Sequence, residues 1–310
     1  ARRFLSFLIT VSLASVIVFL LLEVLPGDPA LTMLGVDAPD SAIEALRLEL
    51  GLDRPAFVRY FDWIAGLFQG EMGLSYVYRV PVTELIGQRL HVTLPLSIGA
   101  MVVATLVSLT LGIFAATNHN RIGDYGVMGF SQLGLAIPDF WFGILLIILF
   151  AVVLHLLPSG GFPGWDEGIW HGVRALLLPI FTQALSLTAI MTRVTRSSVL
   201  EVALEDYVRT ARAKGLSRRA ALWRHVLRNA LVPVLTIGGL LVATVVTGTL
   251  VIENVFALPG VGKLIFDAIS NRDLMVVKNV VLLFAAIVVA VNFAVDILYA
   301  IVDPRIRVHT

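Results

Sequence analysis

Long apolar runs alternate with short polar segments along most of the chain, and this alternation predicts six membrane-spanning helices. Each run has about the 20 residues that an α-helix needs to cross the hydrocarbon of a bilayer. The predicted spans are Phe4–Leu25, Thr93–Ala116, Val127–Leu157, Val173–Met191, Leu231–Phe256 and Val277–Val302. The third span contains Pro138, where we expect a kink, and the fourth is interrupted by Pro179 and Gln183. The sequence therefore predicts an all-α membrane protein.

The segments at the start of the chain add two expectations. The run over residues 1–25 is too long for a signal-peptide core, and no small-residue cleavage site closes it, so we expect a retained span. Residues 26–92 are predicted to be a helical insert: Ser41 and Glu44 have capping-box spacing, and Gly51 is suited to end the short helix that follows. Six further apolar residues predict an amphipathic helix suited either to the membrane surface or to a packed extracytoplasmic cap. They are Phe57, Tyr60, Phe61, Ile64, Leu67 and Phe68.

Composition supports a membrane protein and leaves little room for catalysis. The mean hydropathy is +0.90 and only 15% of residues are charged, against roughly 25% in soluble domains. There is no cysteine and the six histidines are scattered, so we expect no disulfide and no metal site. No Walker A motif or catalytic constellation is present, and the fragment Gly260–Lys263 is interpreted as a turn before a helix. We expect no catalytic residue and no cofactor, so energy for any active process comes from another protein.

Lys and Arg are unevenly distributed between the predicted loops. If the N-terminus is cytoplasmic, the inner segments are 1–3, 118–126, 192–229 and 303–310, with 14 Lys and Arg in 58 residues. The outer segments are 26–92, 158–174 and 255–279, with 9 in 109 residues. By the positive-inside rule, we expect both termini to be cytoplasmic, with residues 303–310 as a cytoplasmic tail.

The longest inner segment contains a basic, helix-prone stretch, DYVRTARAKGLSRRAALWRHVLRNALVP, over residues 206–233. We expect a helix over Glu201–Lys214 that ends at Gly215, and a second helix capped by Ser217. Leu204, Val208, Ala211 and Gly215 would form a small apolar face on the first helix, with Arg209, Arg212 and Lys214 pointing elsewhere. The stretch could dock into a cytoplasmic protein, bind anionic lipid, or serve only as a positive-inside loop.

The segments YVRTARAKGLS and HVLRNALVP resemble the cytoplasmic coupling loop of ATP-binding-cassette (ABC) importer permeases, in particular the dipeptide, oligopeptide and nickel branch. Further motifs agree in order along the chain. They are LPGDP (25–29), GEMGLSY (70–76), IPDFWFG (137–143), TRSSVLEVALEDY (195–207), IENVFALPGVG (252–262) and NFAVDILYAIVDPRIR (292–307). The broader Glu-Ala-Ala signature of such permeases reads Arg209-Thr210-Ala211 here, and the later Pro is displaced to Pro233.

The resemblance implies a type I ABC importer permease fold, in which residues 93–302 form a five-helix core with a coupling loop over 192–230. It implies a second homologous permease chain, two nucleotide-binding ATPase subunits that hold ATP and Mg, an extracytoplasmic substrate-binding protein and a place in the bacterial inner membrane. The coupling residues that it implies are Tyr207, Arg209, Thr210, Ala211, Arg212, Ala213, Lys214, Gly215 and Leu216. Related permeases import di- or oligopeptides, nickel complexes, glutathione or opines, and the sequence does not choose among these substrates.

Helix five offers candidates for a translocation path. Thr236, Thr244, Thr247 and Asn254 lie at helical spacing with small apolar residues and could line a narrow polar path, or could serve close helix packing. Glu253 and Asp139 are carboxylates near helix ends or a kink that could line the path, and Glu253, near the outer mouth, could gate it or contact a binding protein. Asp296 is expected to pair with Arg305 or Arg307. A self-powered secondary transporter or channel is the rival interpretation, but it predicts inverted repeats or charges in the middle of several spans, which are absent from the sequence.

Overall fold

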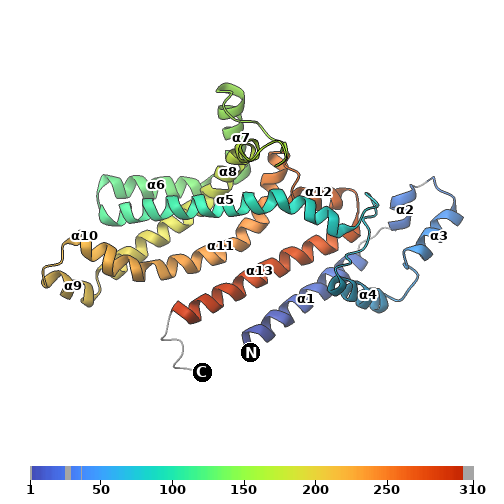
Figure 1. Ribbon diagram of the computed structural model, residues 1–310, viewed down its shortest axis with the longest axis horizontal. Helices are drawn as coiled ribbons and strands as arrows, with labels where there is room; N and C mark the ends of the chain where they lie inside the picture. Colours follow the sequence, from blue (N-terminus) through green and yellow to red (C-terminus); the bar gives the residue numbers. More distant parts are fainter. Residues whose placement is uncertain (1, 25–28, 36, 303–310) are drawn as a thin grey trace. The chain divides into compact units, whose positions relative to one another are not determined.

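The computed structural model describes residues 2–24, 29–35 and 37–302, and within these ranges the chain is helical, with one isolated β-bridge between Leu74 and Pro81. The helices are α1 (Arg2–Val24), α2 (Pro29–Leu34), α3 (Asp40–Glu49), α4 (Ala56–Gln69), α5 (Val82–Thr117), α6 (Ile122–Ala136), α7 (Asp139–Leu146), the π-helix η1 (Ile147–Val153), α8 (Ile169–Ala203), α9 (Asp206–Ala213), α10 (Arg218–Ala221), the π-helix η2 (Leu222–Val226), α11 (Leu227–Val255), α12 (Val261–Ser270) and α13 (Leu274–Val302) (Figure 1). The predicted tail 303–310, residues 25–28 of the LPGDP motif and the side chain of Asp296 lie outside the described part.

Within the described residues, five helices are long and apolar enough to cross a membrane, and a bent pair makes six if it counts as one span. The five are Leu5–Glu23, Val82–Thr117, Ile169–Ala203, Arg218–Val255 and Leu274–Val295. The bent pair is α6 and the segment Asp139–Val153, which meet at an angle of 103°. The break confirms the kink expected at Pro138, because a proline disfavours the helical conformation of the residue before it, and Ile137 is extended here (φ −87°, ψ 124°).

The chain forms two compact units, and the first contains residues 1–94 and 258–290. Its core brings together Phe19 of α1, Trp63 of α4 and Leu282 of α13, each less than 9% exposed. The apolar stripe predicted on α4 is divided between two environments. Tyr60, Ile64 and Leu67 pack against this core, whereas Phe57, Phe61 and Phe68 are 66%, 66% and 89% exposed.

The second unit contains residues 95–257 together with the end of α13 from Val291. Its centre is α8, which packs against α6, α7 and α11 around a core of small and apolar residues. The Gln183 amide, which interrupts the predicted fourth span, donates a hydrogen bond from Nε2 to the Val245 carbonyl of α11 at 2.7 Å. On α5, a Cβ added at Gly112 would lie 2.5 Å from Thr195 Cβ of α8, so only glycine allows the two backbones this close.

Several predicted boundaries are wrong. Helix α5 begins at Val82 rather than Thr93, and α8 covers Ile169–Ala203 rather than Val173–Met191, so residues 82–92 and 192–203 belong to helices rather than to the predicted insert and loop. The apolar pattern stops where charged residues begin, but a helix can continue beyond the hydrocarbon with polar side chains. The capping box is also wrong, since α3 begins at Asp40 after Pro39 and Ser41 lies inside the helix; the left-handed Gly51 after its end is found (φ +64°).

Candidate functional site

The basic stretch folds as a short helix, a turn and a second helix between α8 and α11. Helix α9 covers Asp206–Ala213, and Gly215, with φ +96°, redirects the chain toward α10. Ser217 caps α10, because its Oγ accepts a hydrogen bond from the Ala220 amide at 3.3 Å. The predicted glycine turn and serine cap are confirmed, although α9 begins after the expected Glu201, which still belongs to α8.

Helix α9 is fixed to its own chain by one apolar contact and one polar contact. Val208 is 2% exposed and packs in a cluster supplied by α5, α8, α10, η2 and α11. The members of this cluster are Ala116, Val199, Val208, Ala221, Val226, Leu227 and Ala230. The Asn229 amide donates a hydrogen bond from Nδ2 to the Tyr207 hydroxyl at 2.7 Å. The small apolar face that we predicted for docking is therefore divided, since Val208 faces inward whereas Leu204 precedes α9 and is 67% exposed.

The outward face of α9 and its turn is polar and cationic. Its exposed residues are Tyr207, Arg209, Thr210, Arg212, Ala213, Lys214 and Gly215, while Ala211 and Leu216 are half-buried. The Arg209–Asp206 ion pair, at 3.8 Å between two side chains that are 66% and 98% exposed, contributes almost nothing to stability. The cations on this face are therefore available for a partner, while the inward contacts hold the helix in place.

A buried ion pair that the sequence analysis did not find joins α6 to α8 near the same stretch. Asp124, 1% exposed in the first turn of α6, accepts hydrogen bonds from Arg196 Nε at 2.5 Å and Arg196 Nη2 at 2.7 Å. The Asn120 amide donates to the same carboxylate at 3.0 Å, and His119 Nδ1 lies 3.3 Å from it. The sequence gives no local signal for this pair. Asp124 and Arg196 lie in separate predicted cytoplasmic segments, where each is interpreted as an ordinary loop charge.

The predicted path residues fall into two groups. Thr236, Thr244, Thr247 and Asn254 lie on one side of α11, half-buried or exposed, opposite the face that packs on α8. Three of their side chains donate to carbonyl oxygens of the preceding turn, with Thr247 Oγ1 lying 3.2 Å from both the Ala243 and Thr244 oxygens. This face presents small, weakly polar side chains, of which Thr244 and Thr247 are exposed, and it suits either a path or a second helix.

The two predicted carboxylates lie away from that face. Glu253 is fully buried on the packed side of α11. Asp139, the first residue of α7, accepts a hydrogen bond from Ser186 Oγ of α8 at 3.2 Å, and its buried Oδ1 has no hydrogen-bond partner among the described residues. The structure therefore does not bring the predicted path residues together within this chain.

The motif at residues 70–76 forms a buried polar junction with α13. Ser75 Oγ donates to Asp273 Oδ2, and the Val77 amide donates to the same oxygen at 3.2 Å. Asp273 also accepts from the Val276 amide at 3.2 Å, which caps α13. Burial, and secondarily the Asp273 charge, raise the pKa of Tyr76 to about 12.

Chemistry for catalysis or metal binding was not found in the described part of the chain. No group of three or more His, Asp or Glu side chains is placed to hold a metal ion there. What the fold presents instead is a set of membrane spans, an anchored cationic helix and an open helix face. These features suit a subunit of a membrane transporter.

Comparison with known proteins defines this class. The chain belongs to the family of binding-protein-dependent transport system inner membrane components, whose model matches residues 108–308, while the model of the N-terminal part of such components matches residues 1–97. It is a multi-pass permease subunit of an ABC importer, and the resemblance drawn from the sequence motifs is confirmed.

Individual relatives agree with the family. A protein of Brucella abortus (strain 2308), named as a peptide transport system permease, is 41% identical over 295 residues, which is 95% of this chain and 94% of that protein. The glutathione transport system permease GsiC of Escherichia coli (strain K12) is 40% identical over 99% of this chain and 97% of its own. The inward-facing MetNI methionine ABC transporter matches the fold with a TM-score of 0.59 at 16% identity, covering 71% of this chain and 96% of the matched one.

Proposed function

We propose that this chain forms half of the translocation path of an ATP-driven importer for di- or oligopeptides, and that it receives its driving force through α9. The other half of the path would come from a second homologous permease chain. Two nucleotide-binding subunits would hold ATP and Mg, so that this chain binds no cofactor and catalyses no reaction itself. An extracytoplasmic binding protein would deliver the substrate to the outer side of the bacterial inner membrane.

The observation that carries the proposal is the construction of α9. Val208 on its inward face and the exposed Tyr207–Asn229 hydrogen bond fix the helix, while its outward face carries exposed cations. A helix held in this way can transmit a displacement, because it cannot rotate independently of α11. We therefore assign the contact with the ATPase to residues 207 and 209–216, with Arg209, Thr210, Ala213 and Lys214 at its centre. This placement requires the predicted orientation, with both termini in the cytoplasm.

The open face of α11 is our candidate for this chain's side of the path. Thr236, Thr244, Thr247 and Asn254 would face the corresponding surface of the second permease, and short hydroxyl and amide groups suit weak contact with peptide backbones. Asp139 and Glu253 lie elsewhere, so a role for them would be indirect. Peptides are the substrate class that we favour, since the relatives include permeases named for peptide and for glutathione transport, and glutathione is itself a short peptide.

The test is ATP-driven uptake in vesicles that contain the complete transporter. Arg209→Glu should reduce peptide uptake by at least about tenfold, a loss of roughly 1.4 kcal/mol of coupling free energy, while membrane insertion stays normal. Arg121→Glu is the matched control, because it makes the same charge change at another exposed arginine in a predicted cytoplasmic segment. Uptake that continues unchanged in the Arg209 variant, or uptake by this chain alone with no ATPase present, would refute the proposal.

A further inference from the structure

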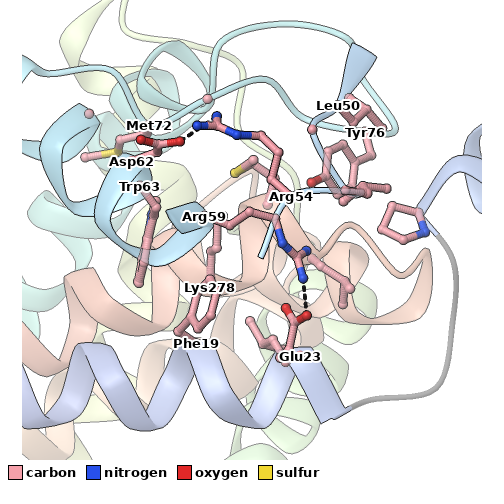
Figure 2. Close-up of a pocket in the computed structure, with 18 of the residues that line it drawn as sticks. Phe19, Glu23, Leu50, Arg54, Arg59, Asp62, Trp63, Met72, Tyr76 and Lys278 are labelled. Carbon is pink, nitrogen blue, oxygen red and sulfur yellow. Dashed lines mark hydrogen bonds and ion pairs between the residues drawn. The ribbon is translucent and has the colours of Figure 1, made fainter. Parts of the chain in front are cut away.

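The first compact unit contains a cavity of about 350 Å³ between α1, α4, the segment 71–76 and the start of α13. Its charged lining residues are Glu23, Arg54, Arg59, Asp62, Glu71 and Lys278. Figure 2 shows Arg59 reaching from α4 to Glu23 at the end of α1, and Arg54 paired with Asp62. The lining thus carries three cations and three carboxylates, with aromatic walls from Phe19, Trp63 and Tyr76.

Two of the cations are already neutralised within the cavity wall. Arg54 lies 2.6 Å from the Asp62 carboxylate, and Arg59 is bonded to Glu23. The Lys278 ammonium lies over the Trp63 ring, 5.1 Å from its centroid, and no carboxylate of a described residue lies within the 4.0 Å of an ion pair. Glu71 likewise has no cation within that distance in the described part of the chain. One positive and one negative group therefore line the cavity without a charge partner.

The walls that carry these groups are held rigidly. Trp63 Nε1 donates to Asn279 Oδ1 at 3.0 Å, and Asn279 Nδ2 donates to the Met72 carbonyl at 2.8 Å. These bonds join α4, α13 and the segment that follows Glu71 into one frame. Lys278 is thus presented by a preformed cavity, and Glu71 lies at its exposed edge.

The height of the cavity relative to the spans indicates what occupies it. Glu23 is the last residue of the apolar span Leu5–Glu23, and Lys278 is four residues into the span that begins at Leu274. The cavity therefore lies where hydrocarbon gives way to headgroups. On the two helices that wall the cavity, Leu20 and Leu21 of α1 are 53% and 63% exposed, and Phe57 and Phe61 of α4 are each 66% exposed. These side chains offer apolar surface to acyl chains on the same helices.

We propose that this cavity binds the headgroup of a zwitterionic, amine-bearing phospholipid, with its phosphate near Lys278 and its ammonium near Glu71. Charge balance favours a zwitterion over a purely anionic headgroup, because Glu71 would repel the latter. The position at the end of two spans favours a lipid over a free solute, since a lipid reaches this depth from the bilayer. The site does not depend on what the transporter imports or on which side of the membrane it faces.

The test is native mass spectrometry of the delipidated complete transporter, titrated with phosphatidylethanolamine, phosphatidylglycerol or the dipeptide Ala-Ala. Lys278→Gln should weaken phosphatidylethanolamine binding about fivefold, while Lys278→Arg should restore it. Glu71→Gln changes one exposed side chain and should weaken phosphatidylethanolamine binding but not phosphatidylglycerol binding. Lys263→Gln is the matched control, because Lys263 belongs to the same unit but does not line the cavity.

Two outcomes would decide against the proposal. Equal phosphatidylethanolamine affinity in the wild type, Lys278→Gln and Glu71→Gln would show that the cavity does not hold the headgroup. Displacement of the lipid by Ala-Ala would assign the cavity to a soluble zwitterion instead. If Lys278→Gln does not assemble, the Glu71→Gln comparison between the two lipids decides alone.

Discussion

Arg196 of α8 donates two hydrogen bonds to Asp124 of α6, from Nε to Oδ1 at 2.5 Å and from Nη2 to Oδ2 at 2.7 Å. The Asp124 carboxylate is 1% exposed. Because the Asp124 carboxylate is buried, the loss of Arg196 leaves its charge without compensation, whereas Arg196 itself is 22% exposed. Arg196 lies ten residues before α9 along the chain, so the pair also holds the end of α8 that precedes the predicted coupling segment.

Removal of either partner is therefore expected to destabilise the protein. Arg196→Met should lower the free energy of unfolding by about 3–5 kcal/mol, the cost typical of a broken buried pair, and Asp124→Asn should cost less because Arg196 is 22% exposed. The double variant Asp124→Leu with Arg196→Met should be more stable than either single variant, since no buried charge is left. Thermal unfolding in detergent measures all three. Additive losses in the double variant would contradict the buried-pair interpretation.

The contact between α5 and α8 at Gly112 gives a second prediction. Gly112→Ala should destabilise by about 1–3 kcal/mol, because the new Cβ would meet the Thr195 side chain and force the helices apart. Gly126→Ala in α6 is the matched control, since nothing lies within 4 Å of its added Cβ. That control should be neutral or stabilising by up to about 1 kcal/mol through its better helix propensity. Equal effects at the two positions would show that α5 and α8 tolerate separation.

The turn after α9 gives a third prediction. Gly215 has φ +96° with open space around it, so Gly215→Ala meets backbone strain but no clash. The strain should be about 1–2 kcal/mol and should fall on the turn rather than on the whole fold. We expect normal membrane insertion and a global unfolding midpoint close to that of the wild type, but several-fold lower ATP-driven uptake. Uptake equal to that of the wild type would mean that the shape of this turn does not matter for coupling.

Alkaline pH tests the junction at Tyr76. The pKa of Tyr76 is about 12 in the folded protein and about 10 when unfolded. Between these values the unfolded chain releases a proton that the folded chain keeps, so the stability contribution is complete below pH 10 and is lost as pH rises toward 12. The loss should reach about 2–3 kcal/mol, at 1.36 kcal/mol per pKa unit.

Variants isolate this effect from other alkaline changes. Tyr76→Phe should unfold with a flatter pH dependence above pH 10 than the wild type, as measured by denaturant midpoints at each pH. Tyr78→Phe is the matched control, because Tyr78 is 41% exposed and lies in the same segment. A wild-type slope in the Tyr76 variant would show that the phenol is not protected by the fold.

Features of the fold that depend on a single residue and its sequence neighbours were predicted correctly. Ser217, Gly215 and Pro138 act through their own backbone or the residues beside them, and the cap, the turn and the kink were found where the sequence placed them. The start of α5 at Val82 was missed because Glu84, Arg89 and His91 end the apolar pattern without ending the helix. An apolar window measures the thickness of the hydrocarbon rather than the length of a helix.

Less of the candidate site could be predicted from the sequence, because the site depends on tertiary contacts between residues that are far apart along the chain. The pairing of Asp124 with Arg196 and the inward turn of Val208 are set by tertiary packing, on which helical spacing gives no information. Glu253 and Thr247 belong to the same predicted span, but they point to different sides of α11, and only the packing of that helix on α8 decides which side is open. The contacts of the predicted coupling residues with an ATPase stay a prediction.

The hydrogen bond from Asn229 to Tyr207 has a consequence for engineering. The stretch from Val199 to Ala230 contains most of the apolar cluster around Val208 and both residues of the Tyr207–Asn229 hydrogen bond. It can therefore be transferred to another permease only as a whole. A chimera that exchanges residues 206–216 alone between two permeases would separate the phenol from its amide and leave Val208 facing unfamiliar neighbours. An exchange of the whole stretch from Val199 to Ala230 would include Asn229 and keep α9 together with the residues that hold it.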